Sequence, residues 1–373
     1  MKLRKLTFTL HRYVGVMLGL LLLVIGLSGS SLVFWKEIHH SRNLSLMQVA
    51  PQGERVTLDS ILEPVRQAYP NWQLTGIFLP RQPTDTYEVR MQANKDQRID
   101  VYVNPYTGEL LGSRQWGQTL MSFVYKLHYT LLAGKIGEKI IGTCGLLLLL
   151  LCMSGLILWP GWKKLGTGFK IRWRSPARLV NYDVHKVVGL LSVVFLSLTA
   201  FSGAGLIFYT EFEGVVYWLT GTPKLPEATS TLVAGKPPIV LDAVLQKADA
   251  ALPGGEITYI RLPQEPDGAF QVAKKLPQEA HPNGGSSVYL DQYSGEILRV
   301  DNAQEASLAN RILNALFPLH IGAYGGLGMR IFYVFLGLAP VTLSATGFVL
   351  WRHRQWDKAR RQEAIRQAER QQA

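Results

Sequence analysis

The chain has 373 residues, of which 47% are apolar, and a formal net charge of +12. A chain of this length folds on average as about two or three domains, and this apolar fraction by itself does not separate a soluble protein from a membrane protein. The only two cysteines, Cys144 and Cys152, are too few for a disulfide framework or a cysteine metal motif, so we exclude both.

Four apolar segments are long enough to cross a hydrocarbon core of about 30 Å, which takes roughly 20 helical residues. None contains Asp, Glu, Lys or Arg, and Trp ends three of them, as interfacial aromatic residues do. The first could instead be a cleaved signal peptide, but it is long for one and a matching sequence recurs inside the chain. In chain order the predicted spans are Val14–Trp35, Ile140–Trp159, Val187–Tyr209 and Ile331–Trp351.

The positive charge is concentrated in the segments that flank these spans on one side. Residues 1–35, 140–210 and 331–373 together hold 18 Lys and Arg but only 4 Asp and Glu. Residues 36–139 and 211–330 together hold 21 Lys and Arg and 23 Asp and Glu. The positive-inside rule then places both termini and the loop between the second and third spans in the cytoplasm. Membrane topology explains the charge, so nucleic acid is not an expected partner.

Each of the two exported segments has the sequence pattern of a small α+β domain. Leu58–Tyr69 and Leu241–Ala251 have the apolar spacing of helices, and alternating, strand-like stretches such as Tyr87–Met91 follow them. The Tyr-Thr-Gly and Tyr-Ser-Gly sequences that end at Gly108 and Gly295 are predicted hairpin turns.

Internal repeats divide the chain into two similar halves. LHRYVG at Leu10–Gly15 recurs as VHKVVG at Val184–Gly189, and VYVNPYTGELLG at Val101–Gly112 recurs as VYLDQYSGEILR at Val288–Arg299. SGSSLVFWKE likewise recurs as SGAGLIFYTE, and SGLILW as TGFVLW. Membrane repeats of equal orientation are usually related by a pseudo-twofold axis along the membrane normal. We therefore predict an α-helical membrane protein, in which four transmembrane helices form a duplicated two-helix unit that carries two exported α+β domains.

These paired strands of the VYVNPYTGELLG type, with the flanking LHRYVG and SGLILW helices, make the chain resemble the PepSY-associated transmembrane family over residues 8 to about 354. Relatives of this kind include inner-membrane ferric-siderophore reductases that hold two haems, and others known only as iron-regulated or peptidase-associated membrane proteins. The resemblance implies a bacterial inner-membrane protein with two PepSY-like domains in the periplasm. The expected segments are membrane helices at 8–36 and 185–210, an outer histidine segment followed by a membrane helix at 128–160 and again at 320–352, exported domains at 37–127 and 211–319, and a cytoplasmic basic loop and tail at 161–184 and 353–373.

The repeats also divide the eight histidines into two classes. Four of them form two equivalent pairs, and ionisable residues at membrane depth are usually functional. The other four have no counterpart, and a lone histidine of this kind is more often a solvated or hydrogen-bonded side chain than a ligand. The pairs are His11 with His185 and His128 with His320, and the unpaired residues are His39, His40, His281 and His353.

Each histidine pair is predicted to bind one haem b through its iron. Two imidazoles from facing helices of a bundle are the usual ligands of a bis-histidine haem. Zinc would require a third or fourth ligand, and no carboxylate or thiol accompanies either pair. Arg12 and Lys186 are equivalent to each other and lie beside the first pair. They either neutralise haem propionates or simply mark a cytoplasmic helix start.

Two further expectations concern the membrane helices. A single helix from His128 to Trp159 would span about 46 Å at 1.5 Å per residue, which exceeds the hydrocarbon core. We therefore expect breaks at Gly134–Gly137 and Gly322–Gly328, with the histidines on preceding short helices. The small residues at Ser28–Ser31 and Ser202–Gly205 are expected to allow close helix packing.

Two haems in opposite leaflets would conduct electrons outward across the lipid bilayer. No GxGxxG after a strand, P-loop or flavin domain is visible, so we expect a separate cytoplasmic or membrane electron donor. By resemblance, the acceptor is a ferric siderophore held outside between the two exported modules. Reduction loosens such a complex, because hard oxygen donors bind Fe³⁺ better than Fe²⁺. The alternatives are a membrane-anchored PepSY module that binds or regulates an extracytoplasmic peptidase, and a transporter subunit.

Overall fold

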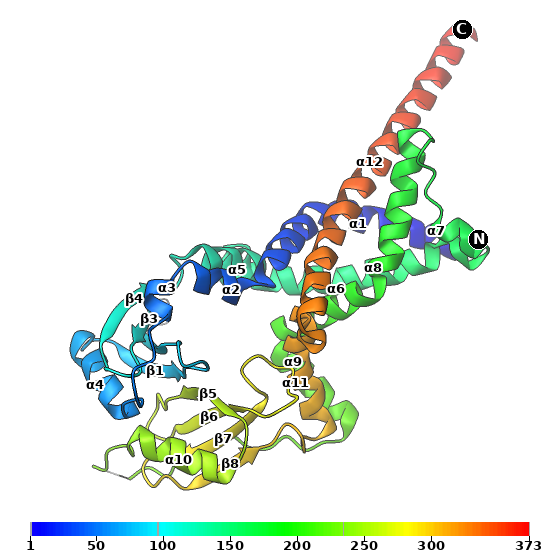
Figure 1. The fold of residues 1–373 in the computed structure, drawn as a ribbon. Coiled ribbons are helices and arrows are strands. Elements are labelled where there is room, and N and C mark those ends of the chain that lie inside the picture. The colour runs from blue at the N-terminus through cyan, green and yellow to red at the C-terminus, as the bar shows by residue number, and fades with distance from the viewer. Residues whose placement is uncertain (1, 95–96, 234, 373) are drawn as a thin grey trace. The chain divides into compact units, whose positions relative to one another are not determined.

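The computed structural model describes residues 2–94, 97–233 and 235–372, which form two compact units (Figure 1). The first unit consists of the N-terminal segment up to Val33, residues Val124–Tyr209 and the C-terminal segment from Leu319. The second consists of Phe34–Phe123 and Thr210–Pro318. Each unit is therefore assembled from segments of both halves of the chain.

The first unit is a bundle of four long helices. Among the described residues, four helices are long and apolar enough to cross a membrane, which confirms the predicted number of spans. The four are α1 (Lys2–Leu32), α6 (Gly134–Leu158), α8 (Ala177–Ile207) and α12 (Gly326–Gln372). Of these, α1 and α8 each pack against both α6 and α12.

Two predicted spans end earlier than expected. The helix α1 ends at Leu32 rather than at Trp35, which begins the short helix α2 (Trp35–Ser41). Likewise α8 ends at Ile207, and Tyr209 begins α9 (Tyr209–Thr220). The intervening residues leave helical geometry, with ψ of 28° at Phe34 and 45° at Phe208. Hydropathy continues through these turns, so it could not locate them.

The expected break before α12 is confirmed, whereas the break before α6 lies at residues 131–133 rather than at Gly134–Gly137, which belong to the first turn of α6. A short helix, α5 (Leu120–Thr130), carries His128, and Leu131 and Leu132 follow it with positive φ before α6 begins. In the other half, α11 (Leu308–Ile321) carries His320 and ends at Gly322, where φ is 71°. Glycine adopts this left-handed conformation without steric cost, so the turn after α11 is relaxed. A one-turn helix, η2 (Ala323–Gly325), then leads into α12.

The loop between α6 and α8 contains two short helices. They are η1 (Pro160–Trp162) and α7 (Leu165–Phe169). Trp159 packs edge-on against Trp162 and Phe169, with ring centroids 5.4 and 5.8 Å apart. These aromatic contacts hold the loop close to the end of α6.

The second unit is built on one eight-stranded antiparallel sheet, in the order β4-β3-β2-β1-β5-β6-β7-β8. Four strands come from each half of the chain, and the two sets join where β1 pairs with β5. The strands are β1 (Gln73–Phe78), β2 (Tyr87–Asn94), β3 (Gln97–Val103), β4 (Leu110–Gln115), β5 (Glu256–Arg261), β6 (Ala269–Lys275), β7 (Ser286–Asp291) and β8 (Ile297–Asp301).

This β1–β5 pair corrects one expectation. The two segments do not form separate modules, because Ile77 of β1 and Ile260 of β5 face each other within a continuous hydrogen-bonded ladder. The α+β pattern itself is confirmed for both segments, since each contributes a helix and four strands. Edge strands with free N–H and C=O groups pair readily, and sequence alternation does not reveal with which partner.

Two helices cover one face of this sheet and form its core. They are α4 (Leu58–Ala68) and α10 (Leu241–Ala251), whose apolar residues pack against the alternate, inward-facing strand residues. The central core residues are completely buried. They are Ile61, Leu62, Val65, Val244 and Ala248 of the helices and Ile77, Val89, Ile260, Val272 and Val288 of the strands.

The two helices cap each other. The Asp242 carboxylate at the start of α10 accepts hydrogen bonds from the backbone N–H groups of Leu58 (3.0 Å) and Asp59 (3.2 Å). The Asp59 carboxylate in turn accepts from the N–H groups of Leu241 and Asp242, at 3.4 and 3.5 Å. A carboxylate satisfies the unpaired N–H groups and the positive end of the helix dipole. The exchange therefore ties the two halves of the sheet together.

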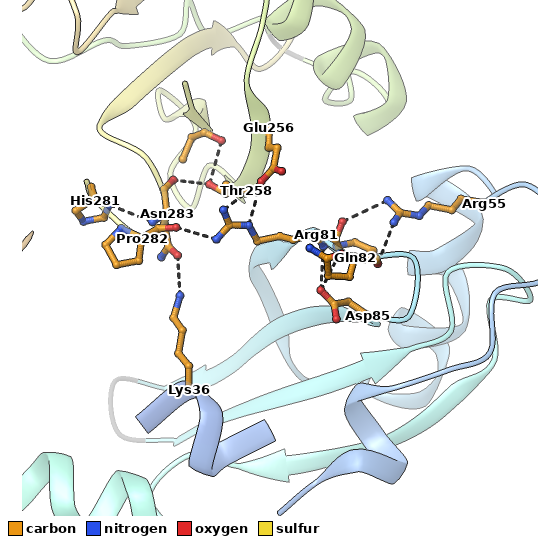
Figure 2. Close-up of polar contacts among 12 residues, drawn as sticks. Lys36, Arg55, Arg81, Gln82, Asp85, Glu256, Thr258, His281, Pro282 and Asn283 are labelled. Atoms are coloured by element: carbon orange, nitrogen blue, oxygen red, sulfur yellow. Dashed lines mark hydrogen bonds and ion pairs between the residues drawn. The ribbon is translucent and has the colours of Figure 1, made fainter. Parts of the chain in front are cut away.

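Polar contacts extend the junction beyond the strands (Figure 2). The Arg81 guanidinium of the first half forms an ion pair with Glu256 and donates to the Pro282 carbonyl of the β6–β7 loop. Lys36 Nζ donates to the Asn283 side chain of that loop. Burial and the nearby Arg81 charge lower the pKa of Lys36. The junction is thus held by charged groups as well as by the β1–β5 ladder.

Candidate functional site

The structure brings the four equivalent histidines together in two pairs. The first pair joins His11 of α1 and His185 of α8, whose ring centroids are 6.3 Å apart with the ring planes at 87°. The second pair joins His128 of α5 and His320 of α11, whose centroids are 6.1 Å apart with the planes at 50°. All four residues belong to the helix bundle, so each pair is described within one compact unit.

Each of the four imidazoles lies against a Ser-Gly or Thr-Gly dipeptide on a neighbouring helix, which we call its cradle. The cradle hydroxyl lies within 3.4 Å of Nδ1, and a Cβ built on the cradle glycine would lie 2.8–3.5 Å from the ring Cε1. The four cradles are Ser154–Gly155 for His11, Thr346–Gly347 for His185, Ser28–Gly29 for His128 and Ser202–Gly203 for His320.

At the first pair, the cradle hydroxyl is the closest hydrogen-bond partner of Nδ1, and the carbonyls of Leu151 and Leu343 are further partners of the two rings. His11 Nδ1 lies 2.8 Å from Ser154 Oγ, and His185 Nδ1 lies 2.9 Å from Thr346 Oγ1. Each hydroxyl donates its own hydrogen to a carbonyl of its helix, at 3.1 Å for the serine and 2.7 Å for the threonine. The hydroxyl oxygen is therefore the acceptor toward the ring, and Nδ1 carries the proton.

At the second pair, a backbone carbonyl is the closest partner of Nδ1. His128 Nδ1 lies 3.0 Å from the carbonyl oxygen of Ile25 and 3.1 Å from the Ser28 hydroxyl. At His320 the corresponding distances are 3.0 Å, to the Thr199 carbonyl, and 3.4 Å, to its cradle hydroxyl. A carbonyl only accepts hydrogen bonds, so Nδ1 of both rings must be the donor.

This arrangement fits the axial ligands of an iron centre. With Nδ1 protonated in all four rings, Nε2 keeps the lone pair that a metal needs. A metal about 2 Å from each Nε2 places two imidazole centroids about 6 Å apart, which matches both pairs. Among the described residues, no group of three or more His, Cys, Asp or Glu is arranged to hold a metal ion. Two imidazoles alone suit a bis-histidine haem better than zinc.

The two pairs lie at opposite ends of the bundle. His11 is in the third turn of α1, whereas Ser28 and Gly29, which hold His128, are near its end. The 17 residues from His11 to Ser28 correspond to a rise of about 25 Å. This rise is smaller than the roughly 30 Å thickness of a hydrocarbon core.

Arg12 and Lys186, which are equivalent in sequence, differ in their surroundings. The Arg12 guanidinium lies over the Tyr13 ring, 4.5 Å from its centroid, and its Nε is buried without a hydrogen-bond partner among the described residues. Lys186 Nζ instead donates to the Asp183 carboxylate and to the Thr167 carbonyl, both at 2.8 Å. Lys186 is therefore satisfied by the protein itself, and an equivalent propionate-binding role for both residues is not supported.

Asp183 is the carboxylate that binds Lys186 and the basic loop. Its carboxylate has no exposed side-chain surface and accepts hydrogen bonds from Arg172 Nε (2.7 Å) and Nη2 (3.0 Å) as well as from Lys186. The contact anchors the basic loop to the first turns of α8, two residues before His185. At the equivalent place on α1 stands Thr9, whose hydroxyl only donates to the Lys5 carbonyl.

The contacts of the cradles with the histidines were not expected from the sequence. Ser28–Ser31 and Ser202–Gly205 were expected to serve helix packing, and Ser30 does so, because its hydroxyl donates to the Val334 carbonyl of α12 at 2.9 Å. The dipeptides at Ser28 and Ser202 instead contact histidines. A signal was present, since Ser-Gly or Thr-Gly occurs once in each of the four predicted spans.

Three of the four unpaired histidines have other contacts. His39 lies 3.4 Å from the Tyr102 hydroxyl, His281 Nδ1 accepts from the Asn283 N–H group, and the His353 ring lies edge-on to Trp356. Burial lowers the pKa of His39 and of His281, which favours the neutral imidazole. These surroundings agree with the interpretation of these residues as hydrogen-bonded or packed side chains.

The sheet of the second unit has a polar face opposite α4 and α10. Residues directly opposed on neighbouring antiparallel strands share a face. Burial and the nearby Asp100 carboxylate raise the pKa of Glu88 on this face to about 7. One continuous row crosses all eight strands and includes four arginines: Arg114, Asp100, Arg90, Gly76, Arg261, Gln271, Tyr289 and Arg299.

Comparison with known sequences identifies relatives of this chain. It is 26% identical over 263 residues to a protein of Pseudomonas aeruginosa described as uncharacterized protein PA4219, and the match covers 63% of this chain and 64% of that protein. The sequence profile of the PepSY-associated TM region matches residues 8–354. That range includes all four histidines of the two pairs and their four cradles, and the chain therefore belongs to the PepSY-associated transmembrane family.

Proposed function

We propose that this protein is a di-haem reductase of the bacterial inner membrane, which passes electrons outward to an extracytoplasmic acceptor. The observation that carries the proposal is the pairing of four half-buried imidazoles, with centroids 6.3 and 6.1 Å apart and Nδ1 hydrogen-bonded in every ring. In this proposal each pair binds one haem b, as His11 with His185 and His128 with His320.

The chain's own residues bind and orient these groups. Bound haem iron supplies one-electron transfer by alternating between the ferric and ferrous states. The cradles hold each ring with Nε2 available, since Nδ1 is committed to a hydroxyl or a carbonyl. Arg12, whose buried Nε has no partner among the described residues, suits a propionate carboxylate beside the first pair.

The direction of transfer rests on the charge distribution. The segments before α1, between α6 and α8 and at the end of α12 are basic, which favours a cytoplasmic location. The first pair then lies toward the cytoplasm, the second pair toward the periplasm, and the sheet unit outside. An electron donor in the cytoplasm or membrane would supply the first pair.

For the acceptor we propose a ferric siderophore. The proposal rests on the family resemblance and on the chemistry of Fe³⁺, which hard oxygen ligands hold more tightly than Fe²⁺. The arginine row on the polar face of the sheet, with aromatic neighbours such as Tyr259 and Tyr289, is a suitable surface for an anionic or aromatic ligand. This face replaces the space between two modules that the sequence suggested.

An anchored PepSY module that binds a peptidase, and a transporter subunit, are the competing functions. Neither requires four imidazoles to be held in pairs with the same nitrogen hydrogen-bonded each time. Haem binding therefore separates the proposal from both alternatives.

The first test is the haem content of the purified protein. Pyridine haemochrome analysis should return about two haems per chain, with the low-spin spectrum of bis-histidine iron. His353→Ala is the matched control, because this half-buried histidine contacts Trp356 and belongs to neither pair. A folded but colourless preparation would rule out the di-haem mechanism.

The second test is vectorial electron transfer. Protein in vesicles of known orientation is reduced from the cytoplasmic face and then given a ferric siderophore and a ferrous-specific chelator outside. We expect haem reoxidation together with ferrous-chelate formation, and loss of both in His320→Ala. If reduced haem persists across a range of ferric siderophores, the acceptor is a different oxidised species even where two haems are bound.

A further inference from the structure

An open groove runs along the surface of the bundle between α1 and α6. Its volume is about 710 Å³, and its walls are mainly apolar side chains such as Leu21 of α1 and Ile140 and Leu147 of α6. Two lysines, Lys135 and Lys139, line the end of the groove nearest the start of α6. Residues four apart lie on the same side of a helix. The groove is therefore apolar along its length and positively charged at one end.

The length of the groove corresponds to one leaflet of a bilayer. From Lys135 to Leu147, α6 rises about 18 Å at 1.5 Å per residue, and the remainder of the helix, to Leu158, rises about 16 Å. One leaflet contributes about 15 Å to a hydrocarbon core of about 30 Å. An acyl chain in the groove would therefore extend from the lysines to the middle of the bilayer.

Neither lysine is neutralised within the described part of the chain. Lys139 Nζ lies 5.0 Å from the centroid of the Phe208 ring, a contact that supplies no anion. The neighbouring Glu138 carboxylate accepts a hydrogen bond from the Tyr129 hydroxyl. Neither ammonium group forms an ion pair with a described residue. In the proposed topology this end of α6 lies on the exported side, so the positive-inside rule does not account for the two cations.

The second half of the chain does not repeat this groove. Apolar residues, Leu327 and Ile331, stand at the positions equivalent to the two lysines. Two of the wall residues are replaced by Phe195 and Phe332, whose ring centroids are 4.8 Å apart, so aromatic rings occupy the equivalent of the groove. The equivalent positions are Lys135 and Leu327, Lys139 and Ile331, Leu21 and Phe195, and Ile140 and Phe332.

We propose that the groove between α1 and α6 binds one anionic phospholipid, with its acyl chains along the apolar walls and its phosphate held by Lys135 and Lys139. Ammonium groups donate charge-assisted hydrogen bonds to phosphate oxygens. A zwitterionic phospholipid offers the same chains, but its headgroup carries no net negative charge to attract the lysines. The lipid would occupy one side of the bundle only. The groove residues belong to neither histidine pair, so the inference does not depend on haem binding.

The test measures lipid selectivity by native mass spectrometry of the purified full-length protein. It is offered phosphatidylglycerol or phosphatidylcholine with the same acyl chains, and we expect preferential retention of one phosphatidylglycerol. Lys135→Gln and Lys139→Gln should each reduce this preference about fivefold, and roughly 30-fold together, the usual contribution of lysines at an anionic lipid surface. Lys126→Gln is the matched control, because this exposed lysine of α5 does not line the groove.

A second change tests the groove rather than its charge. Leu21→Phe combined with Ile140→Phe copies the aromatic pair of the second half and leaves both lysines in place. This protein should no longer retain the lipid, because the rings take the space of the acyl chains. Haem content and thermal unfolding are measured in parallel, and both should show that every variant remains folded.

Four results would overturn the inference. The first two are equal retention of the two lipids by the unaltered protein and an undiminished preference in the double lysine variant. The third is an equal loss in Lys126→Gln, which would show that only overall surface charge matters. The fourth is unchanged lipid retention after Leu21→Phe with Ile140→Phe. A preparation without haem would remove the proposed function and leave the lipid measurement valid, so the two failures are distinguishable.

Discussion

The two histidine pairs are built from the same parts but held with different tightness. A Cβ built on Gly29 or Gly203, beside His128 and His320, would lie 2.9 and 2.8 Å from the ring Cε1. The corresponding distances at Gly155 and Gly347, beside His11 and His185, are 3.4 and 3.5 Å, which is ordinary van der Waals contact. The second pair is thus enclosed more closely than the first.

The difference follows from how the rings reach the bundle. His11 and His185 stand on the long helices themselves, so their rings are placed by helix packing. His128 and His320 stand on the short helices α5 and α11, which must bring the rings to α1 and α8 through tight glycine and carbonyl contacts. A short helix fixes the position of its side chains less firmly than a long one does. The ring on it therefore depends more on contacts with the neighbouring helix.

The largest expected effect comes from removing a ligand. His11→Ala or His185→Ala should each lower the haem content from about two to about one, and the double variant should lose no more, since both residues serve the same iron. His128→Ala and His320→Ala should behave in the same way for the other haem. Additive loss in a double variant within one pair would contradict the pairing.

A smaller and more selective effect is expected from filling the cradles. Gly29→Ala and Gly203→Ala should displace the ring and weaken haem binding at the second pair by roughly 10- to 100-fold, the usual effect of altering such a supporting contact. Gly155→Ala and Gly347→Ala are the matched changes at the first pair and should leave two haems bound. Haem retention during dilution measures both sets, and equal losses in the two sets would show that the closer fit at the second pair has no consequence.

The smallest expected effect concerns the anchor before His185. Asp183→Asn leaves the Arg172 and Lys186 charges without their shared carboxylate and should lower the free energy of unfolding by about 1–3 kcal/mol. Thr9→Ala, at the equivalent place on α1, should change it by much less, because its hydroxyl only bonds within its own helix. Thermal unfolding monitored at the haem absorbance gives both values. A larger effect of Thr9→Ala would reverse the comparison.

The amino-acid sequence determined those features that depend on local composition and on repetition. Four uninterrupted apolar segments predict four membrane helices, because burying charged residues in hydrocarbon is costly. Equivalent positions in the two halves distinguish His11, His185, His128 and His320 from the unpaired histidines. The breaks before α6 and α12 followed from length alone, since one straight helix would not fit the membrane.

Tertiary structure decided what depends on contacts between distant segments. The pairing of β1 with β5 joined two predicted modules into one sheet, and no periodicity within a strand specifies its neighbour. The contacts of Ser154 with His11 and of Thr346 with His185 depend on the packing of α6 and α12 against the helices that carry the histidines. The sequence does not distinguish such a residue from a small residue that only allows helices to pack. Arg12 and Lys186 occupy equivalent positions in the sequence but have different surroundings in the structure, because Asp183 lies beside Lys186 and not beside Arg12.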